Sequence, residues 1–246
     1  PSIAPPPDAV SADPSRSQPI RYDPVTGKTT VGRPGANGHP GSSGEPSRVE
    51  PNRGSGKPAD ASGASPAAGG SEPAAFVEGV GEAGSIGGNT LTATPPSALP
   101  DARSFPFNTV TKMLMRFNVG GVDYYYVCSA ALIAPHHALT AGHCIYNWDP
   151  NNDGSTADAK WADEVWVWSA QSQLGVAANL NQPNRPYGVA KNVNIWSWTG
   201  WTSSQDLNHD LAVVVLDRDV GSRTGWMGRE ANVTTSALNY DGYPVE

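Results

Sequence analysis

Two residues of the sequence are placed to handle a proton together. His143 lies in the motif TAGHC, residues 140–144, and Asp210 directly precedes the apolar run 211–216, which is typical of a buried strand. A carboxylate beside a buried strand is costly to desolvate unless a donor hydrogen-bonds to it, and an imidazole is a suitable donor. Such a carboxylate would fix one ring tautomer and leave the other nitrogen as a general base. The sequence therefore predicts two of the three members of a Ser-His-Asp triad.

The two cysteines of the chain flank the segment that carries this histidine. Cys128 and Cys144 are the only cysteines in 246 residues, and they lie at the two ends of a hairpin-like unit. A single pair in an aromatic-rich chain is more consistent with a disulfide in an exported protein than with two free thiols. We expect this disulfide to hold the histidine segment against the strand of Cys128.

Two possible metal sites match the sequence only in part. A zinc site built from His136, His137 and His143 would lack the His-Glu-x-x-His spacing and a nearby carboxylate. The loop 149–154 alternates oxygen ligands before a glycine, as the first half of a calcium loop does, but Lys160 stands where a bidentate Glu is needed. We predict no metal and no cofactor, with calcium in this loop as the open alternative. The histidines that we expect in turns and on the surface are His136, His137 and His209.

The sequence predicts that short strands position these residues. Apolar alternation or continuous apolar runs recur between polar turns, and helical periodicity is nearly absent. This pattern predicts an all-β fold, a barrel or a sandwich. The predicted strands are 113–119, 124–133, 138–140, 165–168, 189–198 and 211–216.

Composition divides the chain near residue 100. Residues 1–100 hold 17 of the 23 prolines, 16 of the 27 glycines and none of the eight tryptophans, so they cannot bury enough apolar surface to offset the entropy of ordering. We expect 1–100 to be a disordered pro-region or linker and 101–246 to be the functional domain. The net charge is −7 without a basic stripe, which argues against nucleic acid and anionic membranes as partners.

Several motifs of the second part resemble a known family. Residues 140–144 and 209–213 are similar to the histidine and aspartate boxes of trypsin-like serine proteases. Residues 185–188, 223–228 and 240–244 resemble the branch of V8-like glutamyl endopeptidases. The resemblance covers about residues 104–246. It implies the chymotrypsin-like fold of two β-barrels with the active site between them.

The resemblance implies that His143 and Asp210 are catalytic and come from the first barrel, and that the substrate is a polypeptide. The sequence ends about where the second barrel would begin, and no Gly-(Asp/Asn)-Ser-Gly box follows Asp210. The later serines, Ser222 and Ser236, are not flanked by glycines. We therefore expect a secreted serine endopeptidase whose nucleophile and C-terminal half are missing from this chain, which alone is inactive. Arg103-Ser104 is a candidate activation site of a zymogen.

Two other functions are open at this point. A protease-like binding protein that never cleaves would explain the missing serine, although the intact histidine and aspartate boxes count against it. A glycan-binding sandwich on a Pro/Gly/Ser stalk would use the tryptophans as a platform. Because Trp166 and Trp168 share one strand face, as do Trp196 and Trp198, we expect these side chains to cover the barrel instead.

Overall fold

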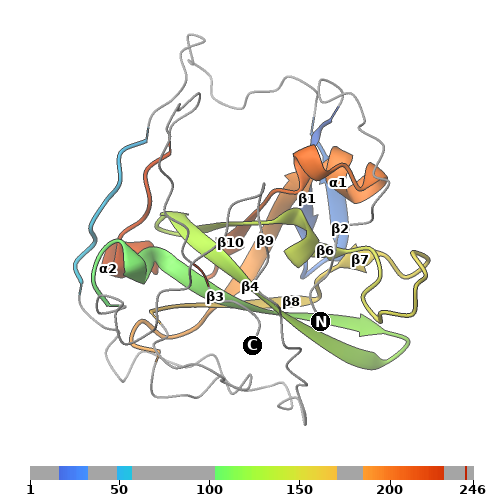
Figure 1. Ribbon diagram of the computed structural model, residues 1–246, viewed down its shortest axis with the longest axis horizontal. Helices are drawn as coiled ribbons and strands as arrows, with labels where there is room; N and C mark the ends of the chain where they lie inside the picture. Colours follow the sequence, from blue (N-terminus) through green and yellow to red (C-terminus); the bar gives the residue numbers. More distant parts are fainter. Residues whose placement is uncertain (1–16, 33–48, 57–102, 171–184, 230–241, 243–246) are drawn as a thin grey trace, which may run out of the picture.

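A computed structural model describes residues 17–32, 49–56, 103–170, 185–229 and residue 242 (Figure 1). The elements in chain order are β1 (Pro19–Asp23), β2 (Lys28–Val31), η3 (Phe107–Thr109), β3 (Val110–Val119), β4 (Val122–Ala134), β5 (His137–Thr140), η4 (Gly142–Cys144), β6 (Tyr146–Asn147), β7 (Lys160–Trp161), β8 (Glu164–Ser169), β9 (Ala190–Trp198), α1 (Thr199–Ser204), η5 (Leu207–His209), β10 (Ala212–Leu216) and α2 (Gly221–Thr224).

Six antiparallel strands close into a barrel. Their order is β10-β5-β4-β3-β8-β9, and an additional pairing of β10 with β9 joins the two ends. These six are the strands that the sequence predicted, with bounds that differ by a few residues. The all-β barrel is thus confirmed among the residues that the structure describes. The second barrel stays a prediction.

The longest hairpin of the barrel depends on a glycine pair. β3 and β4 pair along their whole length, from Val110 opposite Ala131 to Val119 opposite Val122. The two-residue turn between them has φ of 60° at Gly120 and 87° at Gly121. A turn with two positive φ values matches the twist of the flanking strands, and glycine adopts such values without steric cost.

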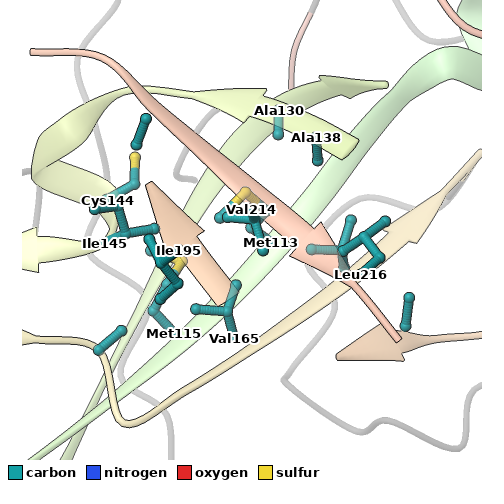
Figure 2. Close-up of a cluster of buried hydrophobic side chains, with 14 of the residues drawn as sticks. Met113, Met115, Ala130, Ala138, Cys144, Ile145, Val165, Ile195, Val214 and Leu216 are labelled. Carbon is teal, nitrogen blue, oxygen red and sulfur yellow. The ribbon is translucent and has the colours of Figure 1, made fainter. Parts of the chain in front are cut away.

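The barrel is filled by alternate side chains from its strands. Met113, Met115 and Phe117 of β3 are completely buried and meet Ile195 of β9 and Val214 of β10 in one core. Figure 2 shows how side chains from several strands converge there. The alternation of 113–119 predicted a half-buried strand, yet β3 is buried on both faces. A second apolar cluster covers its outer side with Leu114, Trp166, Trp168 and the partly buried Tyr125, Val127 and Val189.

Two segments of the first hundred residues belong to the folded domain. For these two segments, the prediction of a disordered region was wrong. Residues 19–23 form β1, which pairs with β9 beside the barrel (Figure 1). Residues 49–56 run along 222–229, with isolated bridges from Val49 to Arg229 and from Asn52 to Trp226. Composition did not predict these two ordered segments, because they are ordered by pairing with β9 and with 222–229, which lie far away in the sequence. The rest of the predicted linker, 1–16, 33–48 and 57–100, lies outside the described residues.

Candidate active site

Antiparallel pairing of β5 and β10 brings the two predicted site residues together. Ala212, near the start of β10, lies opposite Thr140, the last residue of β5. His143 follows β5 on the short helix η4, and Asp210 precedes β10 as the C-cap of η5. Since one strand ends where the other begins, the sequence separation of 67 between His143 and Asp210 does not keep them apart in space.

The aspartate holds the histidine through two hydrogen bonds. The backbone N–H of His143 donates to Oδ1 of Asp210 at 2.7 Å, and Nδ1 of the ring lies 2.7 Å from Oδ2. An ionised carboxylate can only accept, so Nδ1 carries the proton and donates it. A neutral imidazole has one N–H, which leaves Nε2 with its lone pair. The side chain of His143 is 32% exposed and that of Asp210 is 17% exposed. The arrangement therefore presents an oriented general base to solvent or to a substrate.

A disulfide anchors η4 to the barrel wall. Cys144, which follows His143, is bonded to Cys128 of β4, and their Cα atoms are 6.2 Å apart. Cys144 is buried in the main core beside Ile145 (Figure 2). The histidine is thus carried by a segment that is tied covalently to a central strand.

Trp201 of α1 forms a wall behind the histidine. Its ring meets that of His143 edge to face, with centroids 6.3 Å apart, and its indole N–H donates to the carbonyl of Tyr146 at 3.1 Å. The close approach of the Trp201 ring explains why residue 142 is glycine. A Cβ there would lie 2.8 Å from Cδ1 of Trp201 and 3.0 Å from Oδ1 of Asp210. No spacing in the sequence signals that Trp201 lies close to residue 143, so this neighbour could not be predicted.

A second His-Asp pair supports the loop that carries Asp210. Asp206 is buried and caps η5, because its Oδ1 accepts from the backbone N–H and the side-chain amide of Asn208. Its Oδ2 lies 2.8 Å from Nδ1 of His209. Burial alone would raise the pKa of Asp206, but the hydrogen bonds from Asn208 and His209 lower it below the usual value. Aspartate before a short helix is a recognised capping signal, and this signal could have identified Asp206 from the sequence.

The other histidines differ in how they match their prediction. His136 is exposed in the turn before β5, as expected. His137 lies within β5 and is half-buried, and burial, followed by the charges of His136 and Arg229, lowers the pKa of its ring. His209 is buried, so its prediction as a surface residue was wrong. The pairing with Asp206 is the physical reason, since it satisfies a buried imidazole.

The serines that follow the aspartate do not form a nucleophile site in the part that the structure describes. The hydroxyl of Ser222 donates to Oδ2 of Asp219, and its backbone N–H donates to Oδ1 of the same carboxylate. This is a local capping contact at the start of α2. Ser236 lies outside the described residues.

Some of the residues considered for metal binding make other contacts. In the described part of the chain, the one group of three potential ligands is Cys128, His143 and Cys144, and its two sulfurs are joined in the disulfide. In the loop 149–154, both oxygens of Asp149 accept backbone N–H groups, from Asp153 and Gly154. These hydrogen bonds hold residues 149–154 in a turn.

The tryptophans occupy two different environments. Trp166 and Trp168 are buried in the outer cluster, where the guanidinium of Arg185 lies over the Trp168 ring, 4.1 Å from its centroid. Arg185 is only 7% exposed, its three nitrogens have no hydrogen-bond partner among the described residues, and burial lowers its pKa to about 10. Trp196 and Trp198, in contrast, are 41% and 37% exposed on β9.

Comparison with known proteins agrees with this geometry. The model of the Trypsin family matches residues 102–238, which is more than half of the chain. The chain belongs to the trypsin family of serine proteases. The matched range begins at the boundary that composition indicated near residue 100 and includes both His143 and Asp210.

Two curated bacterial proteases are similar to part of the chain. The extracellular metalloprotease of Bacillus subtilis strain 168 is 26% identical over 147 residues, which cover 58% of this chain and 41% of that protein. The glutamyl endopeptidase of Bacillus licheniformis is 28% identical over 122 residues, which cover 48% of this chain and 32% of that protein. The chain thus spans less than half the length of either relative. The second similarity agrees with the V8-like branch.

A solved structure of a Glu endopeptidase in complex with MPD is also similar. It is 23% identical, covers 52% of this chain and 48% of its own, and superposes with a TM-score of 0.35. Among the described residues, no helix is long and apolar enough to cross a membrane.

Proposed function

We propose that this chain provides the histidine and aspartate of a secreted serine endopeptidase. The observation that carries the proposal is the double contact of Asp210 with the backbone N–H and the Nδ1 of His143, both at 2.7 Å. Membership of the trypsin family supports polypeptides as the substrate class. The disulfide and the name of the Bacillus subtilis relative support an extracellular location.

His143 acts as general base and then as general acid in this proposal. Its Nε2 accepts the proton of a serine hydroxyl while the oxygen attacks the scissile carbonyl, and it then donates that proton to the leaving amine. Asp210 stays ionised, keeps the ring in the Nδ1–H tautomer and stabilises the imidazolium. Water then attacks the acyl-enzyme while His143 accepts its proton, and His143 returns that proton to the leaving serine oxygen. The attacking serine comes from a segment that this sequence does not include.

The first experiment tests whether residues 1–246 are inactive alone. A fluorophosphonate, which reacts with activated serines, is incubated with the folded chain, and hydrolysis of a denatured protein substrate is measured in parallel. We expect neither labelling nor hydrolysis above the buffer blank. Covalent labelling of any serine in this chain that is abolished by His143→Ala would overturn the proposed division of the triad.

The second experiment extends the chain with the downstream coding sequence. We expect a glycine-flanked serine in this extension to be labelled. His143→Ala should lower the labelling rate by about 10⁶ and Asp210→Asn by about 10⁴. His136→Ala, an exposed histidine in the same region, is the matched control and should leave the rate unchanged. An extended chain that is folded and remains unlabelled would favour a protease-like binding protein instead.

A further inference from the structure

The N-terminal segment 17–56 contacts the barrel at two separate places. Its first contact is β1, which pairs with β9 from Pro19 opposite Trp198 to Tyr22 opposite Ile195. Its second contact is the run 49–56 along 222–229 (cyan beside red in Figure 1). Between this segment and Ser104 the chain passes through 57–102, outside the described residues. Both contacts therefore join parts of the chain that are far apart in the sequence.

β1 completes an edge that the barrel leaves open. On one edge of β9, β8 pairs only with Ala190 and Lys191, and β1 pairs with Ile195 to Trp198. Without β1, the end of β9 would present unpaired backbone groups. Ile20 of β1 is 7% exposed and belongs to the main core, and Tyr22 stacks on Trp161 with ring centroids 5.3 Å apart. The contact thus combines strand pairing with buried apolar side chains.

The second contact requires an unusually close approach of two backbones. Gly54 and Gly225 both have positive φ, of 62° and 86°. A Cβ on Gly54 would lie 2.3 Å from the backbone nitrogen of Gly225, and a Cβ on Gly225 would lie 2.1 Å from the carbonyl oxygen of Asn52. In addition, the backbone N–H of Gly56 donates to the carbonyl of Arg223 at 2.7 Å. Two contacts on one segment reinforce each other, because the first raises the effective concentration for the second.

The residues before β1 also contact the helix that supports Asp210. The backbone N–H of Gly200 donates to Oγ of Ser17 at 2.9 Å, and Gln18 exchanges two hydrogen bonds of 2.8 Å with Thr199. Gly200 lies directly against the ring of His209, since a Cβ there would be 2.4 Å from its Nδ1. The segment therefore fixes the start of α1 over the buried pair that supports the aspartate loop.

We propose that segment 17–56 is a retained light chain: it stays bound to the barrel after the chain is cut before Ser104, and its binding holds the Asp210 loop. Arg103 and Ser104 are exposed in the structure, and the carbonyl of Arg103 accepts a hydrogen bond from the hydroxyl of Tyr187 at 3.3 Å. The surface that accepts the segment is the edge of β9 together with 222–229. The inference goes beyond the proposed function, since it concerns binding and applies whether or not a serine is supplied.

The test uses the full chain with one inserted protease site. A recognition sequence that occurs nowhere else in the chain is placed between residues 101 and 102, the folded protein is cut, and the products are separated by gel filtration and identified by mass spectrometry. We expect the two fragments to elute together. Elution of the N-terminal fragment on its own, whether the other fragment stays folded or precipitates, would overturn the proposal.

Two variants make the test specific. Ile20→Asp places a charge in the core contact and should increase release of the light chain by roughly tenfold or more. Val25→Asp is the matched control, because Val25 is 88% exposed in the turn of the same hairpin, and it should not change release. Equal release from both variants would contradict a role for β1.

A spectroscopic measurement tests the coupling to Asp210. We expect the proton on Nδ1 of His143 to remain in the NMR spectrum of the cut wild-type protein and to broaden or vanish in cut Ile20→Asp. An unchanged signal after the light chain has been removed would contradict the support of the aspartate loop. Since retention and this signal need no catalysis, failure here is distinguishable from failure of the proposed endopeptidase.

Discussion

Removal of the disulfide between Cys128 and Cys144 should destabilise the domain by about 3 kcal/mol. The bridge closes a loop with a sequence separation of 16 residues. The chain-entropy model gives an entropy loss in the unfolded state of roughly 10 cal/mol/K for such a loop, which is about 3 kcal/mol at 25 °C. Cys144 is also buried in the core, so a cysteine-to-alanine variant loses a little packing in addition.

Urea denaturation measures this effect in two independent ways. The free energy of unfolding is compared between oxidised and reduced wild-type protein and then between wild type and the double variant Cys128→Ala/Cys144→Ala. We expect both comparisons to give a loss of about 2–4 kcal/mol. Reductant should leave the double variant unchanged, which is the control for its other effects. Two free thiols in the untreated protein, or a loss below about 1 kcal/mol, would refute the reasoning.

Three further substitutions test the surroundings of the site. Gly142→Ala should cost about 1–2 kcal/mol of unfolding free energy, because its methyl group overlaps Trp201, and urea denaturation should show partial recovery in combination with Trp201→Leu; a neutral Gly142→Ala would contradict the close approach. Asp206→Asn should cost about 1–3 kcal/mol at pH 7. The lowered pKa of Asp206 stabilises the fold above the carboxyl's unfolded pKa, and this stabilisation is lost as pH falls through the folded pKa. Urea midpoints measured from pH 7 down to 3 should therefore fall less in this variant, and parallel curves would contradict its role. Arg185→Met should be neutral or raise the melting temperature, since it removes a buried guanidinium without hydrogen-bond partners, whereas a large loss of stability would reveal a partner for that charge.

The barrel could be predicted because its strands carry their own signal. Met113, Met115 and Phe117 alternate with residues of the other face, and the run before Leu216 is apolar throughout, so each strand is visible without its partners. β1 is different. Ile20 and Tyr22 alternate within a strand of only five residues that begins with Pro19, and their burial depends on β9 and Trp161, which lie far away in the sequence. Local patterns cannot predict order that comes from distant partners.

In the candidate site, too, some residues have a local signal in the sequence and others depend on distant partners. His143 and Asp210 stand out because one lies beside a cysteine and the other directly precedes a buried apolar run, and the pairing of β5 with β10 then follows from the barrel. Trp201 and His209 have no such local signal. Trp201 reaches His143 through the short helix α1, and His209 is buried because that helix covers it and Asp206 accepts a hydrogen bond from its Nδ1. His143 and Asp210 could therefore be predicted from the sequence as neighbours, whereas the residues that support them could not.

The tautomer of His143 tests the central claim most directly. Nitrogen-15 NMR of the imidazole, recorded near neutral pH on the folded chain, reports which ring nitrogen carries the proton. The contact with Asp210 predicts a protonated Nδ1 and an unprotonated Nε2, and a change of this pattern in Asp210→Asn. A wild-type ring protonated at Nε2, or a spectrum that Asp210→Asn leaves unchanged, would show that the two residues do not form a proton-handling pair.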